Sequence, residues 1–133
     1  MSTVEVVKEF WNKNPLFSGE TNYKLGTKEF FVEHRNVCIN DCYAGRMNSN
    51  FFPHIESKEP IILDLGCGIG FWLIEISNRY ENAKIFGADL SENSIELAKM
   101  RCKIFNVKAS LSIENAESLS FNSELFDHVN CQG

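Results

Sequence analysis

From Ile61 to Gly70 the chain reads IILDLGCGIG, an apolar run that meets a glycine-rich turn. The apolar run predicts a buried strand, and the residues from Phe71 onward predict a helix. Glycines at alternate positions let the backbone approach a ligand closely, because no Cβ stands in the way, and the start of the next helix offers unpaired N–H groups. Asp64 puts an acid at the end of a strand where an aliphatic residue is usual. The segment therefore predicts a site for a nucleotide-like ligand.

The spacing of these glycines separates one nucleotide ligand from another. A dinucleotide-binding turn has the pattern G-x-G-x-x-G. Here Phe71 holds the place of the third glycine, and Gly70 comes one residue early. The resulting D-x-G-x-G-x-G pattern resembles motif I of the class I S-adenosylmethionine-dependent methyltransferases. For this motif alone, a tight turn without a ligand is the alternative.

A second acid follows at the spacing that an adenosine ligand requires. Residues 83–89 predict a strand that ends in Asp89, twenty-three residues after Gly66. A carboxylate at this position has two acceptor oxygens for the two ribose hydroxyls. Asp89 could instead cap the next helix, but Ser91 is the better N-cap, with Glu92 in the first turn. We therefore expect Asp89 to be free for a ligand.

The rest of the chain continues the alternation of strands and helices. Apolar residues recur at helical spacing after Ser91, at Ile95, Ala98, Cys102 and Phe105. Residues 110–114 and 126–131 predict two further strands. This order indicates an α/β, Rossmann-like parallel sheet with crossover helices. Right-handed crossovers and the resemblance give a strand order of 3-2-1-4, with the ligand across the carboxyl ends of the first two strands.

The segment Asn115–Phe121 resembles the family's acidic loop, in which an Asp-Ala pair is followed by Leu-Pro-Phe. Asn115 replaces the usual acid, and Ser120 replaces the usual proline. In the family the acid accepts a hydrogen bond from the adenine amino group. The side-chain carbonyl of Asn115 can still accept it, although more weakly than a charged acceptor.

The resemblance implies a set of cofactor-binding residues at the strand ends. They are Asp64, Gly66, Cys67, Gly68, Gly70, Asp89, Leu90, Asn115, Ala116 and Asn130. Asp64 and the three glycines are expected around the methionine part of S-adenosylmethionine, and Asp89 at the ribose. Leu90 is expected to flank the adenine, whose edge Asn115 and Ala116 contact. Cys67 is interpreted as a small packing residue and not as a nucleophile, and the sequence identifies no catalytic base.

The resemblance also implies the activity, which is methyl transfer to a small-molecule acceptor, as in the type 11 branch of the family. The end of the fourth strand lacks the Asn/Asp-Pro-Pro-Tyr signature of enzymes that methylate amino groups of bases or glutamine. Two alternatives stay open. One is a non-catalytic module that binds the nucleotide or S-adenosylmethionine. The other is an NAD(P)-dependent oxidoreductase, against which Phe71 argues.

The length suggests part of a larger unit. At 133 residues the chain can bury one core, but the family's sheet has seven strands and the chain supplies four. We expect residues 1–58 to form a helical lead segment that acts as a lid, with Thr27 capping one of its helices. Residues 59–133 are expected to form the cofactor-binding half of an incomplete methyltransferase domain, inactive alone. A natural minimal domain is the alternative.

Composition limits the kinds of partner and the cellular location that we expect for the chain. The net charge is −5 and the sequence shows no basic cluster, which argues against a nucleic-acid groove. No apolar run has the length of a membrane span, and five cysteines without a secretory signal favour reduced thiols in the cytoplasm. His34, Cys38 and Cys42 recur every four residues, but no second ligand pair follows, so no metal site is predicted.

Overall fold

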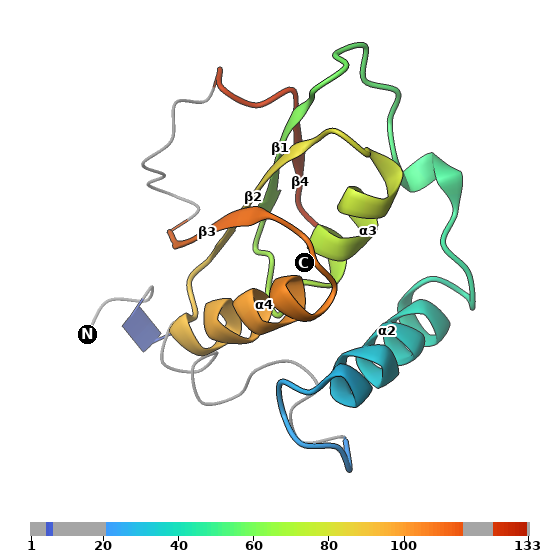
Figure 1. Ribbon diagram of the computed structural model, residues 1–133, viewed down its shortest axis with the longest axis vertical. Helices are drawn as coiled ribbons and strands as arrows, with labels where there is room; N and C mark the ends of the chain where they lie inside the picture. Colours follow the sequence, from blue (N-terminus) through green and yellow to red (C-terminus); the bar gives the residue numbers. More distant parts are fainter. Residues whose placement is uncertain (1–4, 7–20, 116–123, 133) are drawn as a thin grey trace.

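The protein folds around a parallel sheet with the strand order β3-β2-β1-β4 (Figure 1). The computed structural model describes residues 5–6, 21–115 and 124–132. The strands are β1 (Ile61–Leu65), β2 (Lys84–Asp89), β3 (Ala109–Ile113) and β4 (His128–Asn130). This topology confirms the predicted α/β fold class and the predicted order 3-2-1-4.

In residues 21–115 and 124–132, three helices accompany the sheet, together with a short 3₁₀ turn, η1 (Ser49–Phe51). The helices α3 (Phe71–Arg79) and α4 (Glu92–Ile104) pack against the strands, and α2 (Lys28–Cys42) packs against α4 (Figure 1). None of the helices in the described ranges is long and apolar enough to cross a membrane. All five cysteines have free thiols.

Side-chain caps fix the starts of α2 and α4 as the sequence predicts. The Thr27 hydroxyl accepts a hydrogen bond from the Phe30 N–H at 3.3 Å. The Ser91 hydroxyl accepts one from the Ser94 N–H at 3.2 Å. Each cap satisfies one of the N–H groups that the first turn of a helix leaves unpaired.

An aromatic cluster packs around α3 and ties the segment before the sheet to the domain. We define this cluster as Tyr43, Phe51, Phe52, Phe71 and Trp72. The Trp72 ring makes edge-to-face contacts with the other four rings at centroid distances of 5.4–5.9 Å. Such pairs add about 0.5–1.5 kcal/mol each to the free energy gained by burying their surface. The cluster is therefore a main source of stability on this side of the molecule.

A buried arginine joins α4 to α2. Arg101 is 2% exposed, and its guanidinium lies over the Phe31 ring at 5.1 Å. It donates to Nδ1 of His34 at 3.0 Å, so this nitrogen is unprotonated. Burial, and then the nearby charge of Arg101, lower the pKa of His34 to about 3. His34 is thus a neutral acceptor inside the core.

Candidate cofactor site

The carboxyl ends of β1 and β2 lie side by side and frame the glycine turn. Leu65 pairs with Ala88 in the register of the two strands. Beyond this pair, the backbone N–H groups of Gly66 and Cys67 both donate to the Ala88 carbonyl, at 2.8 and 2.9 Å. The turn that leaves β1 is therefore fixed against the tip of β2.

The three glycines of the turn do two different jobs. Gly66, Gly68 and Gly70 have φ values of +71°, +53° and +94°, a region that disfavours any residue with a Cβ. A Cβ built on Gly66 or Gly68 meets nothing within 4 Å, whereas one on Gly70 comes within 3.4 Å of Ala98. Gly66 and Gly68 thus present bare backbone to open space. Gly70 allows close packing of α3 against α4.

Asp64 is a buried acid with one unused oxygen. It is 1% exposed, and its Oδ1 accepts a hydrogen bond from the side-chain amide of Asn130 at 2.9 Å. Its Oδ2 is buried without a hydrogen-bond partner. Burial raises the pKa of Asp64 to about 7; the Asn130 hydrogen bond opposes the rise, and the charge of Asp89 adds to it. An orphaned buried acceptor is costly, and it suits a cationic group on a bound ligand.

Asp89 is tied to the glycine turn. Its Oδ2 accepts the Gly68 N–H at 2.9 Å, and its Oδ1 accepts the Ser91 N–H at 2.9 Å. The expectation that Asp89 is free was wrong in this respect. The turn after Asp64 and the turn after Asp89 each donate one backbone N–H to the Asp89 carboxylate. Each oxygen still has a second lone pair. The side chain is therefore held in one orientation while its acceptor capacity is only half used.

The other predicted site residues differ in how far the structure describes them. Cys67 is 7% exposed, and burial, the largest cause, raises its pKa well above the usual range, which fits a packing role. Leu90 and Asn115 are half-buried beyond the tips of β2 and β3. Ala116 lies outside the described residues. Contacts of these residues with a cofactor stay predictions.

Sequence reasoning missed the buried link between Arg101 and His34. It lies behind the turn, since a Cβ on Gly70 would also come within 3.4 Å of the Arg101 side chain. One signal was available: Arg101 falls three residues after Ala98, on the apolar stripe of α4. A charged residue at a stripe position indicates a buried contact. Its partner on α2, 67 residues away, cannot be read from local spacing.

Comparison with known proteins identifies the family. A family model described as a methyltransferase domain matches residues 62–133, more than half of the chain. The chain belongs to the class I S-adenosylmethionine-dependent methyltransferases. The predicted cofactor class, S-adenosylmethionine, is confirmed at the level of this family. The match begins within β1 and covers the glycine turn and both acidic strand ends.

The similar proteins include methyltransferases with different acceptors. Demethylmenaquinone methyltransferase of Lactococcus lactis is 40% identical over 51% of this chain and 28% of that protein. A tRNA (guanine-N(7)-)-methyltransferase of Ruminiclostridium cellulolyticum is 30% identical over 65% of this chain and 36% of that protein. The chain spans about a third or less of the length of these curated relatives.

A solved structure supports the methyltransferase fold over nearly the whole chain. Geranyl diphosphate C-methyltransferase of Streptomyces coelicolor, solved with Mg²⁺, geranyl diphosphate and S-adenosyl-L-homocysteine, superposes with a TM-score of 0.68. The match covers 98% of this chain and 54% of that one at 16% identity. At this identity the likeness concerns the fold alone.

Proposed function

We propose that this chain is the cofactor-binding part of a methyltransferase that transfers a methyl group from S-adenosylmethionine to a small-molecule acceptor. One observation carries the proposal. Two carboxylates, Asp64 and Asp89, lie at adjacent strand ends, and the turn between them offers bare backbone at Gly66 and Gly68. These residues fit an adenosyl sulfonium, because open glycine positions leave room for it and the acids match its hydroxyls and positive charge.

Each residue would contribute in a definite way. Asp89, oriented by the Gly68 and Ser91 N–H groups, accepts hydrogen bonds from the ribose with its remaining lone pairs. Asp64 offers its orphaned oxygen toward the positively charged methionine end. Leu90 packs against the adenine, and Asn115 with Ala116 meets its edge. Cys67 fills space beneath the turn.

S-adenosylmethionine supplies an electrophilic methyl group on a positively charged sulfur. The chain's own residues hold and orient this donor and exclude water around it, and alignment alone can contribute on the order of 7–11 kcal/mol. The orphaned oxygen of Asp64 compensates positive charge where the carboxylate is already desolvated. No described residue is assigned as a general base.

The division of the chain is part of the proposal. Residues 1–58 act as a lid, and residues 59–133 form the cofactor-binding half. What supports the lid is the packing of α2: Arg35 of α2 forms an ion pair with Glu75 of α3, and His34 accepts a hydrogen bond from Arg101. Movement of α2 would therefore shift the side chains of Glu75 and Arg101, and Arg101 lies next to Gly70 of the glycine turn.

The small-molecule acceptor is favoured by the acidic charge of the chain and by the absence of the Asn/Asp-Pro-Pro-Tyr signature after β4. The relatives named above are named for both kinds of acceptor, demethylmenaquinone and tRNA, so the acceptor has to be measured. We also propose a cytoplasmic location, which the five free thiols support.

The test compares two ligands on two proteins by titration calorimetry. S-adenosylhomocysteine and its 2′-deoxy analogue are titrated into the parent chain and into Asp89→Asn. We expect the parent to prefer the ribose ligand by about tenfold or more, the worth of a hydrogen bond to a charged group, and the variant to lose this preference. The exposed Asp41→Asn is the matched control and should keep it.

Two results would count against the proposal. If Asp89→Asn discriminates between the ligands as well as the parent does, Asp89 does not hold the ribose. If the parent binds neither ligand but binds NADH, the chain is not a methyltransferase cofactor site. Binding without turnover on any acceptor would support the non-catalytic alternative.

A further inference from the structure

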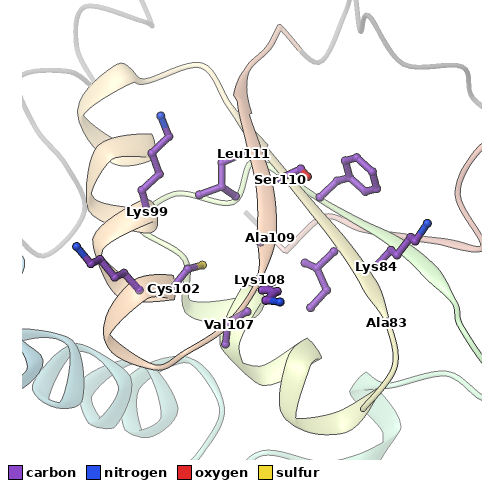
Figure 2. A pocket seen from close by; sticks show the side chains of 12 residues that line it. Ala83, Lys84, Lys99, Cys102, Val107, Lys108, Ala109, Ser110 and Leu111 are labelled. Carbon is purple, nitrogen blue, oxygen red and sulfur yellow. The ribbon is translucent and has the colours of Figure 1, made fainter.

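A second site lies away from the carboxyl ends of the strands. It is a groove of about 770 Å³ between α4 and β3, lined by residues from the amino ends of β2 and β3 and the second half of α4 (Figure 2). None of the predicted cofactor-binding residues lines it. β3 is the edge strand of the described sheet, so no described strand pairs with its outer side.

Four lysines border this groove: Lys84, Lys99, Lys103 and Lys108. All four are exposed. Lys99 lies 3.5 Å from Glu96, while the other three make no ion pair with a described residue. Lys99, Lys103 and Lys108 lie within ten residues of sequence, a local basic run that the prediction of no basic cluster overlooked, and folding places Lys84 beside them. The result is a local excess of positive charge on a chain with a net charge of −5.

The floor between the lysines is apolar. It comprises Ala83, Ile85, Cys102, Val107, Ala109 and Leu111. In Figure 2, Cys102 and Leu111 lie between α4 and β3, with Lys99 on one side of β3 and Lys84 on the other. The pairing of Ile85 with Ala109 places the preceding residues, Lys84 and Lys108, next to each other. Two like charges held side by side favour a negatively charged partner.

The chemistry of the lining favours an acidic polypeptide over a nucleic acid or a phosphate. Among the described lining residues there is no arginine and one aromatic side chain, Phe86, which packs against Phe126 at 5.5 Å. Stacking platforms for bases are thus missing among the lining residues. The nearby end of α4 is its carboxyl end, so the groove lacks the backbone N–H groups that a helix N-terminus offers a phosphate.

We propose that this groove binds a segment of a partner protein in which carboxylate side chains alternate with apolar ones. The apolar side chains of the segment pack on the apolar floor between α4 and β3, and its carboxylates form ion pairs with the lysines on both sides. The groove is separate from the cofactor site, so this proposal does not depend on methyl transfer.

The test uses synthetic peptides and fluorescence anisotropy on the 133-residue chain. The probe is a labelled twelve-residue peptide in which Glu alternates with Val, and two control peptides replace Glu with Lys or Val with Ser. We expect the Glu/Val peptide to bind at least about tenfold more tightly than either control, and its affinity to fall with added salt.

Charge-reversal variants locate the binding. Lys84→Glu/Lys103→Glu/Lys108→Glu should weaken the Glu/Val peptide by about tenfold or more. Lys24→Glu/Lys28→Glu/Lys58→Glu changes the net charge equally at exposed positions elsewhere and should have little effect. Circular dichroism checks folding, and the corresponding Lys→Gln set replaces any charge-reversal variant that unfolds. Affinity for S-adenosylhomocysteine should be the same in all of them.

Several outcomes would overturn the proposal. Lysines that serve only to keep the edge strand from pairing would bind no peptide at all. Equal loss in the groove and control variants would indicate attraction without a site. Groove-dependent binding of a single-stranded oligonucleotide, and not of the peptide, would assign the groove to nucleic acid. Self-association of the chain that the groove variant abolishes would assign it to a second copy.

Discussion

The two ends of the turn from β1 into α3 differ in how well their side chains are packed and hydrogen-bonded. On one side, Asp64 is buried with an unused oxygen, and Gly66 and Gly68 face open space in a backbone conformation that favours only glycine. On the other side, Phe71 and Trp72 begin α3 inside the aromatic cluster, where every ring has edge-to-face or stacked neighbours. The first region carries unmet interactions and the second meets nearly all of its own. Well-packed aromatic rings thus lie next to a turn with unpaired polar groups. This contrast is typical of a turn whose unpaired groups bind a ligand.

The largest effect on stability is expected in the aromatic cluster. Trp72→Ala removes a side chain that is 7% exposed and contacts four rings, so the free energy of unfolding should fall by about 3–5 kcal/mol in urea denaturation. Tyr23→Ala, at a ring that is 49% exposed, is the control and should change it by less than about 0.5 kcal/mol. A loss below 1 kcal/mol for Trp72→Ala would remove the contrast between the two regions.

The next effect should appear at Asp64 and depend on pH. An aspartate in the unfolded chain ionises near pH 3.8, whereas burial raises the pKa of Asp64 to about 7 in the folded state. Between these values the unfolded chain has released a proton that the folded chain keeps. The contribution of Asp64 to the free energy of unfolding therefore falls as pH rises from about 4 to about 7, and then levels off. Buried His34, whose pKa is lowered to about 3, contributes in the opposite direction over much of the same range, so the parent's slope is the sum of both.

Asp64→Asn removes the Asp64 contribution, because the amide does not titrate, and leaves that of His34. At pH 8 the variant should be more stable than the parent, on the order of 2–4 kcal/mol, and at pH 3 the two should be alike. Its affinity for S-adenosylmethionine should fall, since the charge is lost. Urea denaturation across this pH range makes the measurement, and Asp41→Asn, at an exposed acid on α2, should keep the parent's slope. Parallel slopes for Asp64→Asn and the parent would contradict the prediction.

The smallest effect on stability, with a large one on binding, is expected at Gly68. A Cβ there meets no neighbour, so Gly68→Ala should cost only the backbone strain of its positive φ, about 1–2 kcal/mol. The same Cβ would occupy the space proposed for the cofactor, and calorimetry should show a loss of affinity of about tenfold or more.

Gly45→Ala is the matched control for Gly68→Ala. Gly45 also has a positive φ, +86°, and a Cβ there comes no closer than 3.7 Å to Asn40. It should lower the free energy of unfolding by a similar amount, about 1–2 kcal/mol, and leave the cofactor affinity unchanged. If both variants lose binding equally, the turn has no special ligand-facing role.

Local patterns were enough to predict the fold, and the place of the site stays a prediction. The apolar run into the glycine turn, the caps at Thr27 and Ser91 and the acids at two strand ends are all features of short sequence windows. Contacts across long sequence separations were beyond such patterns. The Asn130 hydrogen bond to Asp64 spans 66 residues, and the Arg101 contact with His34 spans 67. The prediction that Asp89 is free was wrong for a different reason. The two N–H groups that its carboxylate accepts are placed by the conformation of the turn, which the sequence pattern does not specify.

The pairing of Asp64 with Asn130 has a consequence for synthesis on the ribosome. At the usual 5–20 residues per second, the 66 residues between them take roughly 3–13 seconds to translate. During that interval β1 and β2 can emerge, but the carboxylate has no amide to receive it. A nascent chain shorter than about 130 residues therefore lacks the amide that holds the Asp64 carboxylate.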